Sequence, residues 1–440
     1  MEKIRNISVV GLLAFILFFI SGYIIGYKES ISTYKLFMQL FIGCLYFAAF
    51  YLCVKLNNIQ STLCLVFLIS LALSFTLRFL FLDYTGNAYE GIMCDTVIYE
   101  SMALKGIGIP YNDYIGMLRT SVSSFNMDDL GYFSYLYVWH NIFRDVDFVR
   151  YLLMALNVGW ITISSYLMFC ISRELGFDDY VGNINSSLYG LFPYWLTSSA
   201  MGDKENLFCF IILCSLYFIC KFQNNRKFTS LLCAIFFAIL AYFFRFAISL
   251  MIIILIFVAF VANEYNKKKI LLYMTVLALF FLFFLNVILV NTTDVSLDTV
   301  QRTTYYRMKQ STGGGVVGWF VQIFSAFLGP FPNFLRTNRS AFYFSSGLLF
   351  KDMLGIFALL GIWKVVKNYS WHFYPIAAFF IMGSLMLIVS AVSLDMRYHI
   401  TFFSAFLLLS SYGIEFFDRK VVYCSYLLVS FLLILMYNFR

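Results

Sequence analysis

Long apolar runs separated by short polar segments make up most of the chain. Runs of ~20 residues recur along its whole length, and this is the length that an α-helix needs to cross a bilayer. They predict thirteen membrane-spanning helices, near residues 8–27, 34–54, 62–82, 148–172, 181–200, 206–222, 228–244, 246–263, 270–290, 346–366, 373–393, 398–416 and 421–438. The runs lack the apolar–polar alternation of membrane β-barrel strands. The pattern therefore predicts an all-α, polytopic membrane bundle in which residues 1–440 form a single membrane domain.

One apolar tract, residues 228–263, is too long for a single crossing of ~20 residues. Only one charged residue, Arg245, interrupts it. A charged side chain is costly within the hydrocarbon core. We therefore expect two helices that form a hairpin, with Arg245 at its tip.

Two long polar intervals separate the apolar runs. The first, residues 83–147, predicts an outer loop with short helices. The second, residues 291–345, contains the glycine joint 313–315 and then an apolar stretch, 316–328, that is too short to span. We expect this stretch to form an interfacial or re-entrant helix in a second outer loop.

Lys and Arg indicate the orientation, because they concentrate in cytoplasmic loops. Placing Lys3 and Arg5 inside also places the other short basic loops inside. These are the loops that contain Lys55, Arg173, Lys227, Lys268, Lys367 and Lys420. The opposite face then collects residues 83–147, 203–205, 245, 291–345 and 395–397. The run 8–27 is too long for a typical signal-peptide core and lacks a clean small-residue cleavage site, so we expect a retained first span and a cytoplasmic N-terminus.

The composition supports a membrane protein and excludes several soluble classes. Hydrophobic residues make up 62% of the chain, charged residues 12%, and the mean hydropathy is +0.82, which exceeds what a soluble domain can bury. The net charge of +8 is scattered over short loops, so nucleic acid is not an expected partner. Most of the ten Cys lie within apolar runs, and no metal-binding or nucleotide-binding motif is present. We expect no metal and no cofactor.

The first candidate for chemistry is the pair Asp95 and Tyr99 in the interval 83–147. Four residues apart, the two side chains share one face of a helix. A carboxylate held over the membrane surface could deprotonate a sugar hydroxyl, which must become nucleophilic to attack an activated anomeric carbon. The alternative is that Asp95 caps the helix and Tyr99 anchors it at the interface.

Two further charged groups lie at outer helix junctions. The first group is Asp203-Lys204-Glu205. Asp203 can cap the helix that follows and Glu205 lies in its first turn, so both acidic residues have a structural explanation. Lys204 at a helix N-terminus opposes the helix dipole, so either an anionic partner or a neighbouring carboxylate must explain it. In the other group, Arg397 either contacts a substrate or forms an internal ion pair with Asp395.

Arg245 is the strongest single candidate. An ionisable residue within a membrane costs ~3 kcal/mol on insertion scales and indicates a function. A guanidinium binds phosphate through two parallel hydrogen bonds and keeps its charge, which suits a phosphate or diphosphate leaving group. Other cations of the same face can bind substrate, or instead water and lipid headgroups. They include Arg307, Arg336 and Arg339.

The order of these features resembles a known group of enzymes. The features are Asp95-x-x-x-Tyr99, Leu191-Phe192-Pro193 ahead of Asp203-Lys204-Glu205, Arg245 in a broken apolar tract, Gly329-Pro330-Phe331-Pro332, and Arg397 before an apolar span. They resemble the polytopic glycosyltransferases of bacterial surface-polysaccharide clusters. These comprise the GT-C-type enzymes and the Wzy-type polymerases of O-antigen or capsule repeat units.

The resemblance implies a GT-C-like fold in the bacterial inner membrane and a glycosyltransferase acting at the periplasmic face. It implies polyprenyl-phosphate or polyprenyl-diphosphate sugars as substrates, Asp95 as the catalytic base, and Arg245 at the leaving group. The remaining candidates would bind substrate: Tyr99, Lys204, Glu205, Arg307, Arg336, Arg339 and Arg397. The expected partners are a polyprenyl-linked oligosaccharide, membrane lipid and a chain-length regulator protein.

Three functions remain open from the sequence. The two large outer loops with several Arg fit a repeat-unit polymerase. GT-C enzymes usually place the acidic loop after the first span, whereas here it follows the third, but a transferase that adds one sugar remains the close alternative. A flippase of lipid-linked sugars is a third possibility. Transporters tend to have inverted repeats and charges near the midplane, and the sequence has neither matching halves nor such mid-span charges.

Overall fold

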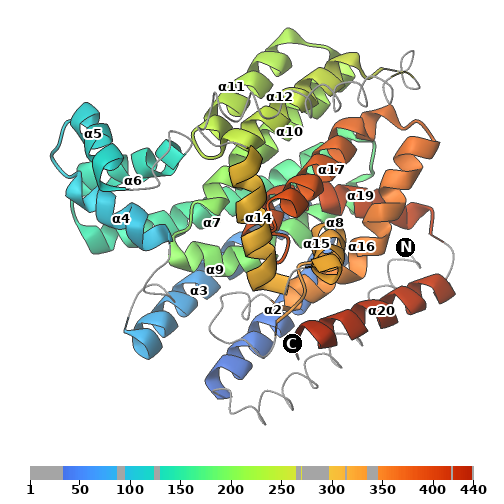
Figure 1. Cartoon of the computed structure of the whole chain (residues 1–440), viewed down its shortest axis with the longest axis horizontal. Helices are drawn as coiled ribbons and strands as arrows, with labels where there is room; N and C mark the ends of the chain where they lie inside the picture. Colours follow the sequence, from blue (N-terminus) through green and yellow to red (C-terminus); the bar gives the residue numbers. More distant parts are fainter. Residues whose placement is uncertain are drawn as a thin grey trace.

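A computed structural model gives the structure of the chain (Figure 1). It describes residues 33–86, 95–122, 129–263, 269, 297–312, 315–333, 345–417 and 420–438. Within these residues every regular element is a helix. The α-helices are α2 (Thr33–Leu56), α3 (Ile59–Thr85), α4 (Asp95–Lys105), α5 (Tyr111–Ser121), α6 (Leu130–Phe143), α7 (Val146–Glu174), α8 (Asp179–Gly190), α9 (Pro193–Met201), α10 (Glu205–Asn225), α11 (Phe228–Tyr242), α12 (Phe246–Val261), α14 (Leu297–Thr312), α15 (Gly315–Leu328), α16 (Ser345–Lys367), α17 (Tyr374–Val389), α18 (Met396–His399), α19 (Phe403–Glu415) and α20 (Lys420–Asn438). Two short 3-10 helices are η3 (Trp371–Phe373) and η4 (Ile400–Phe402).

Six of the described helices are long and apolar enough to cross a membrane. They are Leu36–Leu56, Ile59–Asp83, Val146–Glu174, Glu205–Asn225, Trp371–Val389 and Val421–Asn438. The expected all-α, membrane-embedded architecture is therefore confirmed. The number of thirteen spans and the GT-C-like fold stay predictions, and the predicted spans 8–27 and 270–290 lie outside the described residues.

The segment of the predicted span 181–200 is not one continuous helix, because two helices, α8 and α9, replace it. Pro193 has no N–H and cannot continue the helix begun by α8. The missing bond would have reached the carbonyl of Tyr189, four residues earlier. That oxygen instead accepts a hydrogen bond from the indole Nε1 of Trp195 at 2.7 Å. The break thus leaves no buried carbonyl unsatisfied at this position and redirects the chain towards α10.

α8 is held in the bundle by polar contacts rather than by apolar packing alone. The Thr62 hydroxyl on α3 donates to Asn183 at 2.8 Å, and the Ser411 hydroxyl on α19 donates to Asn185 at 2.6 Å. Both Asn side chains are buried. Buried polar groups need hydrogen-bond partners, and here neighbouring helices supply them. α8 therefore lies in the protein interior.

The predicted spans near the C-terminal end form helices with altered boundaries. Residues 346–366 lie in α16 and 421–438 in α20, whereas the span predicted at 373–393 ends earlier, with α17. The span predicted at 398–416 is divided into α18, η4 and α19. Asp395 starts this segment, since its carboxylate accepts a hydrogen bond from the backbone N–H of Arg397 at 3.0 Å.

The hairpin predicted in the 228–263 tract is confirmed. α11 and α12 pack against each other, and the Ser249 hydroxyl donates to the carbonyl of Ala238 at 2.7 Å. At the other end of the hairpin, the Arg226 guanidinium donates to the carbonyl of Ala259 at 2.8 Å. Arg245 lies at the tip, with extended backbone angles just before α12 begins.

Both polar intervals contain short helices, of which α14 was not predicted from the sequence. Residues 83–147 contain α4, α5 and α6, which project together from one side of the bundle in Figure 1. The second interval contains α14 and α15. α15 exposes the large apolar side chains Val316 and Phe320, and its expected interfacial or re-entrant position stays a prediction.

The helices α16 and α19 approach each other through glycine. A Cβ atom added to Gly361 would overlap the backbone carbonyl of Leu409, and one added to Gly413 would overlap that of Phe357. Small residues allow the backbones of membrane helices to approach closely. Glycine at both positions therefore allows the backbones of α16 and α19 to lie in contact.

Gly413→Ala is expected to destabilise the protein, because its new methyl group overlaps backbone that cannot rotate away. Overpacking typically costs about 1–3 kcal/mol, and more where backbone must shift. The measurement is the melting temperature of the purified protein in detergent. Gly159→Ala on α7 is the matched control, because nothing lies within 4 Å of its added Cβ. Equal melting temperatures for the two variants would contradict this account of the packing.

Candidate active site

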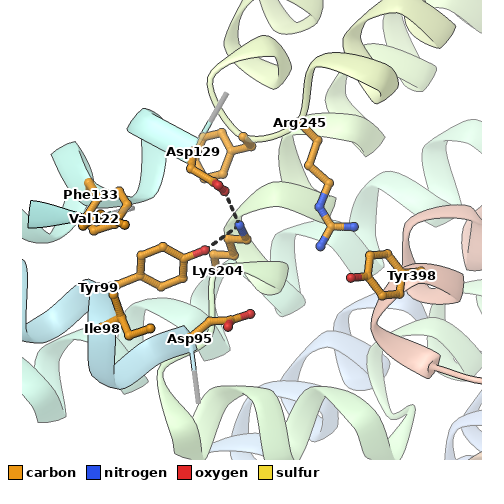
Figure 2. Close-up of a pocket in the computed structure, with 10 residues that line it drawn as sticks. Asp95, Ile98, Tyr99, Val122, Asp129, Phe133, Lys204, Arg245 and Tyr398 are labelled. Carbon is orange, nitrogen blue, oxygen red and sulfur yellow. Dashed lines mark hydrogen bonds and ion pairs between the residues drawn. The ribbon is translucent and has the colours of Figure 1, made fainter. Parts of the chain in front are cut away.

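A cavity of about 340 Å³ lies where α4, α6, the start of α10 and the tip of the α11–α12 hairpin meet. Figure 2 shows its side chains. Its lining residues are Asp95, Ile98, Tyr99, Val122, Asp129, Phe133, Lys204, Phe244, Arg245 and Tyr398. Three of the sequence segments singled out above therefore reach one cavity: the start of α4, the residues before α10, and the hairpin tip. Ligand sites in proteins have volumes of ~300–1,000 Å³, so this cavity is large enough for a small-molecule ligand.

Lys204 is fixed between two side chains (Figure 2). Its ammonium donates to the Tyr99 hydroxyl and to the Asp129 carboxylate, each at 2.7 Å. Burial lowers the pKa of Lys204, but Tyr99 and Asp129 more than offset this and raise it above its ordinary value. Burial also raises the pKa of Tyr99 to about 12. Near neutral pH the ammonium therefore keeps its charge and the phenol keeps its proton.

Asp95 forms an ion pair that joins distant parts of the chain. The Arg397 guanidinium lies 3.3 Å from the Asp95 carboxylate and 2.9 Å from that of Asp395. Asp95 is the first residue of α4, where a negative charge is favourable, and its side chain is 67% exposed. The pKa of Arg397 is raised, because the charges of its carboxylate neighbours outweigh the effect of burial. Asp95 thus faces the cavity as an accessible carboxylate.

Arg245 is held by charge and by aromatic rings (Figure 2). Its guanidinium lies 3.7 Å from the Glu205 carboxylate, 4.9 Å from the centre of the Tyr398 ring and 5.7 Å from that of Phe208. To the residues that the structure describes, the guanidinium donates no hydrogen bond. Its side chain is only 23% exposed. A cation with five unused donors at a cavity wall is ready to bind an anion.

The hairpin tip is docked onto α6. The backbone N–H of Gly131 donates to the carbonyl of Phe243 at 2.7 Å. A Cβ at Gly131 would clash with the Phe244 ring and the Phe243 carbonyl, so glycine is needed for this close approach. The Phe244 ring also stacks on Phe208. These contacts set the position of Arg245, the next residue in the chain.

α4 is fastened to α7 by a pair of parallel hydrogen bonds. The Arg150 guanidinium donates to both oxygens of the Glu100 carboxylate, at 2.7 and 3.0 Å. Glu100 is buried. Paired Arg–carboxylate bonds of this kind define geometry as well as energy. Together with the bond between Lys204 and Tyr99, they set the position of Asp95 at the cavity.

Asp203 does not cap α10, contrary to the expectation from sequence. The residue before the helix is Lys204, which makes no side-chain cap. The Asp203 carboxylate instead accepts a short hydrogen bond from the Thr96 hydroxyl on α4. Burial, together with the nearby charge of Glu205, raises the pKa of Asp203 to about 7 from its ordinary 3.8. A bond across two helices has thus replaced the local cap.

The raised pKa of Asp203 predicts a pH-dependent stability. A carboxyl with a higher pKa in the folded state favours folding when it is protonated, and this contribution is lost as pH rises from about 4 to above 7. Asp203→Asn cannot lose that proton and can still accept from Thr96. The melting temperature of the variant minus that of the wild type should therefore increase between pH 4.5 and 8. A difference that stays constant or decreases over this range would contradict the assignment.

The structure brings most of the predicted site residues together. Asp95, Tyr99, Lys204 and Arg245 line the cavity. Two others lie directly behind them, because Arg397 pairs with Asp95 and Glu205 with Arg245.

The remaining predicted site residues are Arg307, Arg336 and Arg339. The Arg307 guanidinium on α14 donates weakly to the carbonyl of Ser390, at 3.4 Å, and Arg307 does not line the cavity. Arg336 and Arg339 lie outside the described residues. The second polar interval therefore adds no described side chain to this cavity.

Several lining residues were missed by the sequence analysis. Asp129 is one of many charges in a polar interval, and nothing in the sequence indicates that Lys204, 75 residues away, is its partner. Phe133 and Phe244 looked like ordinary apolar positions. Tyr398 could have been found, since it follows Arg397 directly. Within the described residues, no group of three or more His, Cys, Asp or Glu side chains could hold a metal ion.

Comparison of the sequence with models of known protein families gives no match, and comparison with curated proteins gives none of significance.

Proposed function

We propose that the protein is a membrane glycosyltransferase that acts on sugars linked to a polyprenyl phosphate or diphosphate. In the proposed reaction, Asp95 removes the proton from an acceptor hydroxyl. The hydroxyl oxygen then forms a bond to the anomeric carbon of the donor sugar, and the bond from that carbon to the phosphate oxygen breaks. The polyprenyl phosphate or diphosphate leaves with the bonding electron pair, and Arg245 stabilises its charge.

One observation carries this proposal. A carboxylate and a guanidinium with unused hydrogen-bond donors, Asp95 and Arg245, line the same cavity although 150 residues separate them in the sequence. Base-assisted attack needs an accessible carboxylate at one side of the reacting carbon and a cationic site for the departing phosphate at the other. Arg397 supports this arrangement, because its guanidinium lies 3.3 Å from the Asp95 carboxylate and helps to hold it at the cavity.

The proposed location follows from the substrate. A lipid-linked sugar stays anchored in the bilayer, so its transferase needs a site at a membrane surface. The six long apolar helices provide the membrane anchor. We propose the bacterial inner membrane, with the cavity on the periplasmic side and the N-terminus in the cytoplasm. The partners proposed are the lipid-linked oligosaccharide, membrane lipid and a chain-length regulator.

Among transferases, we propose a polymerase that joins O-antigen or capsular repeat units. The support is the two long polar intervals, of which the first supplies much of the cavity wall. Deleting the gene in its host and separating the surface polysaccharide by length tests this. A polymerase predicts loss of long chains and retention of a single capped repeat. Full-length chains that lack one side sugar would contradict polymerisation and indicate a transferase for single sugars.

A further inference from the structure

The cavity has two chemically different halves (Figure 2). On one side Arg245 and Tyr398 face each other, with the ring centre 4.9 Å from the guanidinium carbon. On the other side, Lys204 lies among Tyr99, Asp129 and Phe133. In the first half, the Arg245 guanidinium lies 3.7 Å from the Glu205 carboxylate and donates no hydrogen bond to the described residues. In the second half, the Lys204 ammonium lies 2.7 Å from the Asp129 carboxylate and donates a hydrogen bond to it.

Charge in the second half is balanced within the protein. The Lys204 ammonium lies 2.7 Å from the Asp129 carboxylate. The charge of Asp95, at the boundary between the halves, is matched by Arg397. An anion entering here would gain little from Lys204, because Asp129 already neutralises it, and would meet the repulsion of Asp129. Like charges brought together are unfavourable, and a binding site can use this repulsion to reject a wrong partner.

The hydrogen-bonding groups of this half suit hydroxyls. Asp129 is 34% exposed on its side chain, and only one of its oxygens accepts from Lys204; the other oxygen has no partner among the described residues. The Tyr99 hydroxyl accepts from Lys204, and among the same residues its own proton has no acceptor. A sugar hydroxyl both donates and accepts, so it can satisfy Asp129 and Tyr99 together. A carboxylate can only accept, and would leave Asp129 without a donor.

Part of the wall of this half is aromatic. The rings of Tyr99 and Phe133 lie with their centres 4.8 Å apart and both line the cavity. The C–H groups of a pyranose ring can pack against such a wall while its hydroxyls reach the polar groups. A phosphate has no apolar face to place there, and the other half offers it the better cation.

From this arrangement we infer that the Lys204–Asp129–Tyr99 half is a subsite for an uncharged sugar and that it selects against sugars with a carboxylate, such as uronic acids. The inference rests on the proposed function, because it identifies the class of sugar that the transferase handles. Asp129 then acts as a specificity-determining residue. It orients Lys204, and it repels acidic sugars.

Binding of free sugars to the purified full-length protein in detergent, measured by saturation-transfer NMR, tests the inference without turnover. The probes are glucose with glucuronic acid and galactose with galacturonic acid, whose members differ only at C6. The wild type should bind the neutral member of at least one pair about tenfold or more tightly than the acid. Equal affinity, tighter binding of the acids, or binding of no probe would overturn the inference.

Asp129→Asn supplies the second arm. Asp129 makes no side-chain cap for α6, so the change removes charge without removing a helix cap. The preference for neutral sugars should fall at least fivefold or reverse, because Lys204 is no longer neutralised. Asp113→Asn, in the first turn of α5 and outside the cavity, makes the same change in net charge and should keep the wild-type ratio. An unchanged ratio in Asp129→Asn would overturn the role of Asp129.

The two proposals fail in different ways. A protein that forms glycosidic bonds but shows no preference between the members of a pair contradicts only the subsite. A protein that prefers the neutral sugars but forms no glycosidic bond contradicts the transferase and leaves a saccharide-binding site.

Discussion

Replacing Asp95 by Asn is expected to lower the rate of glycosyl transfer by about a hundredfold to ten-thousandfold, the usual contribution of a general base. Asn keeps the shape of the side chain and loses the basic oxygen. Only a weak, exposed ion pair with Arg397 and a favourable helix-end charge are lost, and each is worth about 1 kcal/mol or less. The protein should therefore remain folded while the chemistry is lost. The measurement is the initial rate of transfer to a lipid-linked acceptor at matched protein concentration.

The control for this variant is Asp113→Asn. Asp113 also lies in the first turn of a helix, α5, and does not line the cavity. Its rate should equal that of the wild type. If Asp95→Asn also transfers sugar at the wild-type rate, then Asp95 is not the catalytic base. Its role would be limited to the helix-end charge and the ion pair with Arg397.

Arg245→Lys is expected to lower transfer by about a hundredfold while leaving the protein inserted and abundant. Lysine keeps the charge beside Glu205 but loses the planar fork that matches two phosphate oxygens. Loss of a donor that stabilises developing charge typically costs about 3 kcal/mol, or on the order of a hundredfold in rate. Chain length and amount of polymer, measured in a complemented strain at matched expression, test this.

Arg226→Lys is the matched control, because it shows whether a weakened hairpin alone lowers the rate of transfer. Arg226 lies at the opposite end of the α11–α12 hairpin, where it donates to carbonyls at the end of α12. Its replacement should lower the melting temperature but not the rate per folded molecule. Near-wild-type polymer in the Arg245→Lys strain would mean that the guanidinium only reaches headgroups, where Lys serves nearly as well.

Residues that interrupt the apolar pattern were the best guide to where helices end. Arg245 divides its tract in the sequence and in the structure, because the tract is too long for one crossing and a charge is best placed at the tip of a hairpin. Pro193 carried the same kind of information and was not used, so the break between α8 and α9 was missed. The buried Asn183 and Asn185 were a second indication that this stretch is no lipid-facing span.

Pairing between distant segments could not be read from the sequence. Asp203 was assigned to cap α10 because caps are local, yet it bonds Thr96, 107 residues away. Of the two explanations given for Lys204, the structure shows the one in which it pairs with a carboxylate of the protein, Asp129. The sequence alone does not indicate which carboxylate of the outer interval is the partner. Folding selects Asp129, because α6 docks on the hairpin tip through Gly131 and Phe243. Such choices depend on tertiary packing.

The central claim, that glycosidic bonds form in this cavity, is tested most directly with purified protein in liposomes that contain a labelled lipid-linked oligosaccharide. The wild type is predicted to convert the label into longer lipid-linked saccharide, and the Asp95→Asn and Arg245→Lys proteins are predicted to form little or none at matched amounts. Movement of the label across the bilayer without any new glycosidic bond would contradict the claim and identify a transporter of lipid-linked sugars. Equal product from all three proteins would show that the bonds form elsewhere.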